Sequence, residues 1–282
     1  MTNTIIGSEF PVGADGSVYH LGVKKGEVAP RILTVGCVKR AEKFAGLFLD
    51  PGFTAYSCDR KFAIFTGTRR GVACSVVGSL MGYPNMDFVV RESRYVIDGP
   101  MAIVRLGTSG TPRDDVPLGT VALASQGCVG IIRNPDAFGS DSSASPYLFT
   151  NTVPPTNDKL IEACRIRLKE RVGDRFREGV GASACSFYSA QGRVTAEFED
   201  RNSTVLDQLL EKEPRVVNLE METFHLYDLA RICKKSTIAV AGAAIVIAQR
   251  TQDQFIDMNL KEQLENLSGE ACMDALVDFV LE

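Results

Sequence analysis

Three residues suited to binding an oxyanion lie close together near the middle of the chain. The segment Met101–Gly110 reads MAIVRLGTSG, so four apolar residues precede Arg105, and glycines then frame Thr108 and Ser109. The apolar run predicts a buried parallel strand that ends in a glycine turn. A guanidinium, two hydroxyls and exposed backbone N–H groups at the carboxyl end of such a strand can bind phosphate. The alternative is a strand-to-loop turn with a surface salt bridge.

Arg40 is a second candidate anion contact. Residues 31–36, RILTVG, predict a strand that again ends at a glycine. Phe44, Leu47 and Phe48 follow at helical spacing, which places Arg40 near the N-terminus of a helix. Backbone N–H groups and the helix dipole favour anions there. The alternative is that Arg40 lies on a solvated first turn.

Side chains that can read a pyrimidine base occur in residues 183–193, SACSFYSAQGR. Gln191 and Arg193 are two residues apart and point the same way if the segment is extended. Glutamine offers a donor and an acceptor and arginine offers several donors, which fits alternating carbonyl and N–H groups. Phe187 can lie against the ring. A polar loop with one buried aromatic residue is the alternative.

Two carboxylates mark a predicted strand-to-helix junction. Residues 216–222 read VVNLEME, which places Glu220 and Glu222 on the rim of the predicted sheet. They can be partners of the helix dipole or accept hydrogen bonds from the vicinal hydroxyls of a sugar. His225 lies among apolar residues of the following helix and is predicted to be structural.

The remaining pattern predicts the elements that position these residues. A turn is predicted at 66–71, and a long surface loop between about 133 and 158, where four prolines accompany many small polar residues. The succession of strand, helix and strand before Gly110 predicts a right-handed parallel crossover. Further strands are predicted at 72–77, 119–125 and 238–248, and amphipathic helices at 158–172 and 258–282.

Composition limits the class of protein. The chain has 282 residues, of which 45% are hydrophobic and 23% charged, which is typical of one soluble globular α/β domain. A net charge of −4 with scattered basic residues argues against a nucleic-acid partner. No apolar run reaches the roughly 18 residues that span a membrane, and the N-terminus lacks the pattern of a signal peptide. We therefore expect a cytoplasmic protein with no membrane partner.

The cysteines predict no metal site. Eight cysteines are dispersed without a Cys-x-x-Cys pair, and the chain has only two histidines. In a reducing compartment they need no disulfides, and several lie in apolar runs as small hydrophobic residues. No basic neighbourhood marks one of them as a nucleophile.

Six motifs, taken together, resemble one family. They occur in the order found in uridine phosphorylases, of the nucleoside phosphorylase type I superfamily, and extend from about residue 19 to the C-terminus. Phe-Tyr-x-x-Gln-x-Arg marks the uridine branch, and Glu-Met-Glu marks the superfamily more broadly. The motifs are Tyr19-His-Leu-Gly22, Gly36-x-x-x-Arg40, Arg60-x-Phe62, Arg105-Leu-Gly-Thr-Ser-Gly110, Phe187-Tyr-x-x-Gln-x-Arg193 and Glu220-Met-Glu222.

The resemblance implies a fold, a reaction and an assembly. The fold is a single α/β domain spanning residues 1–282, with a mixed central β-sheet flanked by helices in three layers and residues 1–18 as a peripheral extension. The reaction is the reversible phosphorolysis of uridine to uracil and ribose 1-phosphate in pyrimidine salvage, with inorganic phosphate as co-substrate and no cofactor. The minimal unit is a homodimer whose sites are shared across the interface.

The resemblance also assigns roles to residues. His20 and Arg60 would reach the site from a partner subunit, His20 toward the ribose 5′-hydroxyl. The phosphate-binding residues would be Gly36, Arg40, Arg60, Arg105 and Thr108. The nucleoside-binding residues would be His20, Thr108, Ser109, Gly110, Phe187, Gln191, Arg193, Glu220, Met221 and Glu222. The catalytic residues would be Arg105, Gln191, Arg193 and Glu222.

The chemistry of the reaction is coherent with these roles. Breaking the N-glycosidic bond builds positive charge on the sugar while the base leaves with negative charge. Phosphate held by arginines both stabilises and attacks that cation. Gln191 and Arg193 stabilise the uracil anion, and Glu222 fixes the ribose. No side-chain nucleophile is required.

The sequence departs from the family in three places. Cys37 and Val38 replace an aspartate and a proline that are usual in the family. The loop that carries Arg40 is therefore expected to differ in conformation from the family's loop. Lys61 replaces a glutamate that helps bind a cation between subunits, and no interface ion is assigned. The glycine-rich stretch at 78–84 is longer than usual.

Three alternatives to a uridine phosphorylase follow. A purine nucleoside phosphorylase of the same fold would need an acid, typically an aspartate, where this chain has Gln249 or Arg250. A nucleosidase that uses water has no need for the phosphate arginines. A non-catalytic nucleoside-binding homologue is compatible with the altered loop. Acceptance of thymidine or 2′-deoxyuridine depends on the clearance around Glu222 and Phe187.

Overall fold

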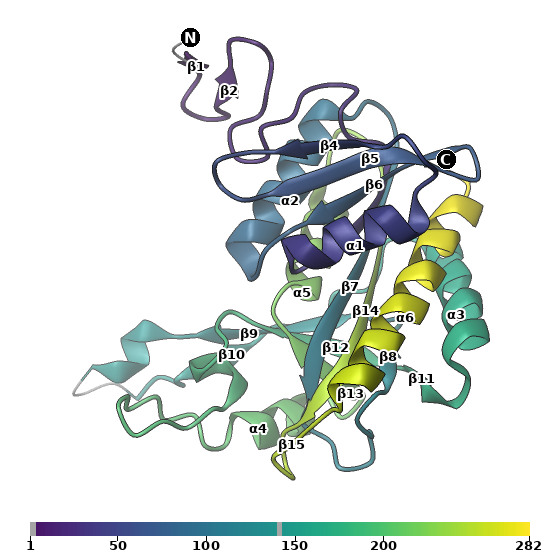
Figure 1. The fold of residues 1–282 in the computed structure, drawn as a ribbon. Helices are drawn as coiled ribbons and strands as arrows, with labels where there is room; N and C mark the ends of the chain where they lie inside the picture. Colours follow the sequence, from purple (N-terminus) through teal and green to yellow (C-terminus); the bar gives the residue numbers. More distant parts are fainter. Residues whose placement is uncertain (1–3, 140–142) are drawn as a thin grey trace.

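The sheet is organised around β7 (Met101–Thr111) in the computed structural model, which describes residues 4–139 and 143–282 (Figure 1). β7 pairs in parallel with β14 (Ile238–Gln249) along its length and with β3 (Arg31–Val35) over its first half. Near its end, Gly110 pairs antiparallel with Leu219. The sheet is therefore mixed and the domain is α/β, as the sequence predicts.

The other strands extend the sheet on both sides of β7. Within the described residues it has thirteen strands, whose main path runs β10-β9-β12-β13-β7-β3-β6-β5-β4, while β14 joins β8 and β15 to β7 and β8 pairs with β11. A separate hairpin of β1 (Ile5–Ile6) and β2 (Val12–Gly13) precedes it. The remaining strands are β4 (Thr54–Ser57), β5 (Ala63–Arg69), β6 (Val72–Gly78), β8 (Val121–Leu123), β9 (Cys128–Arg133), β10 (Tyr147–Phe149), β11 (Phe176–Glu178), β12 (Val180–Ala184), β13 (Val216–Glu220) and β15 (Gln254–Phe255).

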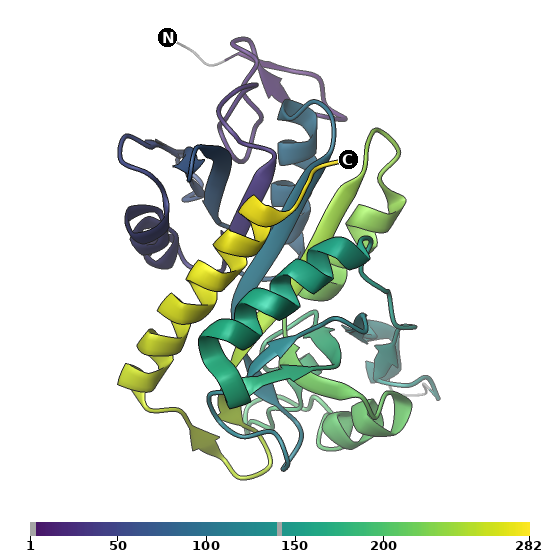
Figure 2. The ribbon, with the colours of Figure 1, turned by 90° about the vertical axis from the view of Figure 1, so that its right-hand side faces the viewer.

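Helices cover both faces of the sheet. Alternate residues of a strand point to opposite faces; accordingly Val104 and Leu106 pack with α1, α3 and α6, whereas Met101 and Ile103 pack with α2 and α5. Figure 2 shows α3 and α6 side by side on one face. The result is three layers. The helices are α1 (Val38–Phe48), α2 (Tyr83–Val96), α3 (Asp158–Val172), α4 (Val205–Lys212), α5 (Thr223–Ile232) and α6 (Met258–Asp278), with 3-10 turns η1 (Pro135–Phe138), η2 (Gly173–Arg175) and η3 (Ser189–Gln191).

Local signals set the helix ends that the sequence predicts well. Asn157 caps α3 by accepting a hydrogen bond from the backbone N–H of Leu160 at 3.1 Å, and the helix has the predicted limits. Asp257 likewise accepts from Asn259 and Leu260 at the start of α6. The end of α6 was predicted too late, because the helix stops at Asp278 rather than at the C-terminus.

Two predicted turns are strands instead. β7 continues through Gly107 to Thr111, because β14 pairs with it along this whole stretch. β5 likewise continues to Arg69 against β6, so the hairpin turn is confined to Arg70 and Gly71, with φ angles of 53° and 75°. In both cases cross-strand pairing outweighs the local preference of glycine and threonine for turns.

The predicted crossover and the predicted long loop have different outcomes. β6 and β7 are both parallel to β3 with α2 in their connection, so the predicted parallel crossover is confirmed in its direction. The predicted loop at 133–158 contains η1 and β10, which pairs antiparallel with β9. Residues 140–142 of that loop lie outside the described residues. No helix among the described residues is long and apolar enough to cross a lipid bilayer.

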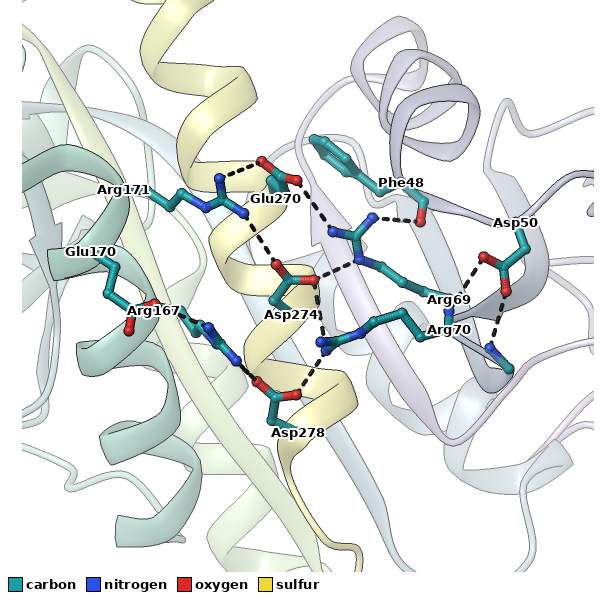
Figure 3. Close-up of polar contacts among 11 residues, drawn as sticks. Phe48, Asp50, Arg69, Arg70, Arg167, Glu170, Arg171, Glu270, Asp274 and Asp278 are labelled. Atoms are coloured by element: carbon teal, nitrogen blue, oxygen red, sulfur yellow. Dashed lines mark hydrogen bonds and ion pairs between the residues drawn. The ribbon is translucent and has the colours of Figure 1, made fainter.

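An ionic network joins α6 to the β5–β6 hairpin and to α3 (Figure 3). Asp274, which is 6% exposed, lies 2.7 Å from Nε of Arg69 and 3.6 Å from Nη2 of Arg171. One turn later, Asp278 pairs with Arg70 at 2.7 Å and with Arg167 at 2.6 Å. The network fixes α6 across the sheet between elements that are about 100 to 200 residues away from it in sequence.

We expect Asp274→Asn to lower the free energy of unfolding by about 1.5 to 3 kcal/mol, because it leaves the partly buried Arg69 with only the more distant Glu270 as a carboxylate partner. Urea denaturation measures this. The matched control is Lys159→Ala, which removes an exposed pair with Glu282 and should cost less than about 1 kcal/mol. Equal costs for the two variants would contradict a structural role for Asp274.

Candidate active site

A cavity of about 240 Å³ lies where the carboxyl ends of β3, β7 and β13 meet. Every residue predicted for the site lines it except His20 and Arg60. β3 and β7 are parallel neighbours, whose carboxyl ends point to the same edge of the sheet, and β13, although antiparallel to β7, meets it there through Leu219 opposite Gly110. The lining residues are Gly36, Cys37, Arg40, Met81, Arg105, Gly107, Thr108, Ser109, Gly110, Phe187, Gln191, Arg193, Leu219, Glu220, Met221, Glu222, Ile247, Ala248 and Phe255.

Arg105 occupies the floor of this cavity and is only 3% exposed. Its Nη1 lies 3.2 Å from Oε2 of Glu220, and its Nη2 donates to Glu222. Burial alone would lower the pKa of the guanidinium, but the two carboxylates raise it above its ordinary value. The site therefore holds a permanently charged cation in a place that water hardly reaches, and the predicted alternative of a surface salt bridge is wrong.

Glu220 anchors the start of α5. Its carboxylate accepts backbone hydrogen bonds from Glu222 at 3.0 Å and from Thr223 at 3.0 and 3.1 Å, and a hydrogen bond from the Ser183 hydroxyl. A carboxylate at a helix N-terminus satisfies free N–H groups and complements the helix dipole. Of the two alternatives for this residue, the geometry therefore favours the helix partner.

Glu222 faces the cavity instead. Its Oε1 accepts the backbone N–H of Gly82 at 2.6 Å, and its Oε2 accepts from Arg105. Leu80 and Gly82 adopt φ angles of 58° and 89°, so the loop before α2 is bent in a way that aims this N–H at the carboxylate. Burial raises the pKa of Glu222, against the opposing effect of Arg105. Glu222 is the group that can accept hydrogen bonds from sugar hydroxyls.

Arg40 reaches the same cavity from the first turn of α1. Its side chain is 14% exposed, and Nη2 lies 2.9 Å from Glu265 of α6, which also pairs with Lys261 at 2.8 Å. Cys37, the N-cap of α1, makes no side-chain capping hydrogen bond. Arg40 is thus partly buried and oriented by α6 rather than fully solvated, and the uncapped helix N-terminus beside it can also receive an anion.

Gln191 and Arg193 lie on the opposite wall. The segment is not extended as predicted, because residues 189–191 form η3 and Gly192 has a φ of 66°. The two side chains still meet: Nη1 of Arg193 donates to Oε1 of Gln191 at 2.7 Å, and its Cζ lies 3.7 Å from the Phe187 ring centroid. Burial, followed by the nearby Arg250, lowers the pKa of Arg193 to about 10.

Several residues of the site were not predicted. Arg250 donates to the backbone oxygen of Gln191 at 2.9 Å and so holds η3 in place. Gly82 supplies the N–H that holds Glu222, whereas the sequence marked its segment, 78–84, only as a long glycine-rich stretch. Phe255 lines the cavity from β15, and 61% of it is exposed. Periodicity cannot identify such residues, since each acts through a contact with a distant segment.

His20 and Arg60 lie together outside the cavity. The His20 ring stacks on Phe88 at 3.7 Å between centroids, and its Nδ1 lies 2.6 Å from Glu92. Arg60 lies over the Tyr19 ring at 4.4 Å. The chain therefore presents both side chains on one surface, separate from the cavity that it lines itself.

His225 stacks on Tyr83 with 5.3 Å between ring centroids and lies 3.4 Å from Asp87, so its contacts are structural, as predicted. Within the described part of the chain, no three His, Cys, Asp or Glu side chains are grouped so that they could hold a metal ion.

A family model, related sequences and solved structures all identify the same family. The family model of the phosphorylase superfamily matches residues 30–279. A uridine phosphorylase of Thermococcus kodakarensis (strain ATCC BAA-918 / JCM 12380 / KOD1) is 26% identical over 264 residues, covering 93% of this chain and 88% of the relative. A DeoD-type purine nucleoside phosphorylase of Anoxybacillus flavithermus (strain DSM 21510 / WK1) is 30% identical over 250 residues, covering 87% and 95%.

Solved structures agree. A structure from a study of two diverse uridine phosphorylases in the oomycete Phytophthora capsici has a TM-score of 0.94 and 36% identity, covering 99% of this chain and 100% of that one. A Trypanosoma brucei nucleoside phosphorylase described as showing uridine phosphorylase activity has a TM-score of 0.74 and covers 96% and 100%. Its identity of 21% supports the fold alone.

The floor of the cavity provides a test of the Arg105 geometry. A Cβ on Gly107 would lie 2.8 Å from Cζ of Arg105 and closer still to Nη1. We expect Gly107→Ala to displace the guanidinium and weaken the binding of inorganic phosphate at least about tenfold in calorimetric titration, with the circular dichroism spectrum unchanged.

Gly46→Ala is the matched control, since it adds the same methyl group on α1 where nothing lies within 4 Å. That variant should bind phosphate like the unmodified protein. Unchanged phosphate affinity in Gly107→Ala would show that Arg105 does not bind phosphate from this position.

Proposed function

Since the chain belongs to the phosphorylase superfamily, we propose that it is a uridine phosphorylase, which converts uridine and inorganic phosphate reversibly into uracil and ribose 1-phosphate. The observation that carries the proposal is the arrangement of one cavity. Its lining combines Arg40 and Arg105, the hydrogen-bonded pair of Gln191 and Arg193, and the carboxylate of Glu222. A nucleoside and an oxyanion need these three kinds of group.

At the phosphate end, Arg40 and Arg105 would hold the anion together with Thr108 and the free N–H groups at the start of α1. The anion's charge is stabilised by guanidinium groups in a largely dry site. An oxygen of phosphate forms the new bond to C1′ of the ribose as the bond from C1′ to N1 of the base breaks. Bound phosphate also stabilises the positive charge that develops on the sugar.

At the base end, the electron pair of the broken bond moves onto uracil. The amide of Gln191 can accept from N3–H and donate to a carbonyl, and Arg193 can donate to a carbonyl that gains negative charge. Phe187, which already carries the Arg193 guanidinium on its face, offers a wall for the ring. Gly192 and Arg250 keep the pair in this arrangement.

Glu222 would bind the ribose hydroxyls beside Met221. Glu222 is paired with Arg105, the same side chain that phosphate would require. A sugar that draws the carboxylate away therefore frees the guanidinium, and phosphate that draws the guanidinium away frees the carboxylate. Each substrate favours the binding of the other under this proposal.

The contacts of Gln249 and Arg250 oppose the purine alternative, which the 30% identity to a DeoD-type enzyme makes worth testing. A purine base leaves more easily when an acid protonates it. Gln249 has no acid group and binds backbone, donating to the carbonyl of Arg113. Arg250 points to the backbone of η3. Neither side chain supplies a proton at neutral pH.

The proposal includes a homodimer with shared sites. His20 and Arg60 are held on one surface by contacts with Phe88, Glu92 and Tyr19, outside their own cavity. A two-fold axis brings such a surface to the partner's cavity and repeats the contact in return. Under this arrangement each phosphate site gains a third arginine. Pyrimidine nucleoside salvage in the cytoplasm is the role that the reaction implies.

Loss of uridine absorbance with and without phosphate tests the proposed reaction. We expect release of uracil that requires phosphate, and no comparable cleavage of inosine. Arg105→Ala should lower kcat/KM about 100- to 1000-fold, whereas Gln191→Ala should mainly raise KM for uridine, about tenfold or more. Inosine cleavage would assign the chain to the purine branch, and inactivity with both nucleosides would indicate a binding protein.

Mixing inactive variants tests the shared site. If Arg60 completes the partner's cavity, a dimer of one Arg60→Ala and one Arg105→Ala chain has one intact site of two. Unfolding and refolding an equimolar mixture should then restore roughly a quarter of the activity. A mixture of Gln191→Ala and Arg105→Ala, which damage the same cavity, is the control and should show no activity above the mean of the two variants measured separately. A mixture with Arg60→Ala that also stays inactive would contradict the arrangement.

A further inference from the structure

A second cavity, of about 530 Å³, lies between α2, α5 and the N-terminal segment, and it shares no lining residue with the candidate active site. Its walls are mainly apolar, with contributions from Val90 of α2, Leu229 and Ile232 of α5, and Phe10. Phe10 stacks on Tyr95 with 4.5 Å between ring centroids, so the segment before the main sheet forms part of the wall. An apolar body is the natural occupant of such walls.

The polar groups of this cavity are cations. Arg91, Arg94, Lys234 and Lys235 line it, and no acidic side chain does so among the described residues. Arg91 is paired with Asp87 at 2.8 Å, and Lys235 lies 3.7 Å from Asp98. Within the part of the chain that is described, Arg94 and Lys234 form no ion pair.

Arg94 is the unusual member of the group because it is only 7% exposed. Its Nη2 donates to the backbone oxygen of Ile97, but Nε and Nη1 have no hydrogen-bond partner among the described residues. Burial lowers the pKa of Arg94, yet arginine keeps its proton at neutral pH. Asp98 attracts Arg94 only from beyond ion-pair distance. A buried cation without an ion-pair partner is costly, and an anion beside it lowers that cost.

We propose that this cavity binds a small amphiphilic anion, a carboxylate carried on an apolar body, with Arg94 as the anchor and Lys234 at the entrance. A single carboxylate balances the single buried guanidinium, and the apolar body covers the walls from Phe10 to Ile232. The site is independent of the proposed phosphorolysis, since no residue of the reaction contributes to it.

Calorimetric titration of the full chain with octanoate, and with octanamide as its uncharged counterpart, tests the site. Saturating inorganic phosphate is present throughout, so the candidate active site is occupied. We expect octanoate to bind at least about tenfold more tightly than octanamide, and Arg94→Gln to abolish this difference. Arg91→Gln is the matched control, because Arg91 is exposed and already paired, and it should keep most of the preference.

Three outcomes would overturn the proposal: no binding of octanoate, equal affinity for the two probes, or a preference that survives in Arg94→Gln. If Arg94→Gln does not fold, Lys234→Glu replaces it, since that side chain is exposed. Its carboxylate at the entrance should weaken octanoate binding at least about threefold and leave octanamide unaffected. Unchanged octanoate binding in that variant would count against the site.

Discussion

The buried guanidinium of Arg105 between two carboxylates is the interaction on which the site depends. Its charge is stable at this depth only because Glu220 and Glu222 lie within reach of it. Glu220 is itself fixed by the N-terminus of α5, and Glu222 by the N–H of Gly82. The same constraint explains Gly107, since any side chain there would occupy the place of the guanidinium.

The fold provides this constraint by bringing three strand ends together. β7 carries Arg105, β13 ends at Glu220, and β3 leads into the turn of α1 that presents Arg40. α6 then contributes from outside the sheet, because its Glu265 orients Arg40 while its Asp274 ties the helix to the β5–β6 hairpin. Stability and the orientation of the proposed phosphate ligand Arg40 thus depend on different turns of one helix.

The second cavity differs from the first in how the charge of its buried arginine is compensated. Arg105 forms ion pairs with two carboxylates of the chain, whereas Arg94 forms no ion pair among the described residues and is attracted by Asp98 only from a longer distance. Both arginines are buried, and they differ in the source of the anion that compensates their charge. In the first cavity, the proposed phosphate would compete with internal carboxylates for the guanidinium. In the second, an external carboxylate would be the missing partner.

The sequence by itself determined the kinds of group in the site and most elements that carry them. Apolar periodicity and caps act locally, so the limits of α3, the strand before Arg105 and the junction after Glu220 could be predicted. The tertiary structure alone decided that β7 continues through Gly107 and that Gln191 meets Arg193 across a 3-10 turn. It also decided between the two roles predicted for Glu220, because the pairing of β7 with β14 and the contacts of the Glu220 carboxylate with Ser183 and Arg105 join residues far apart in sequence.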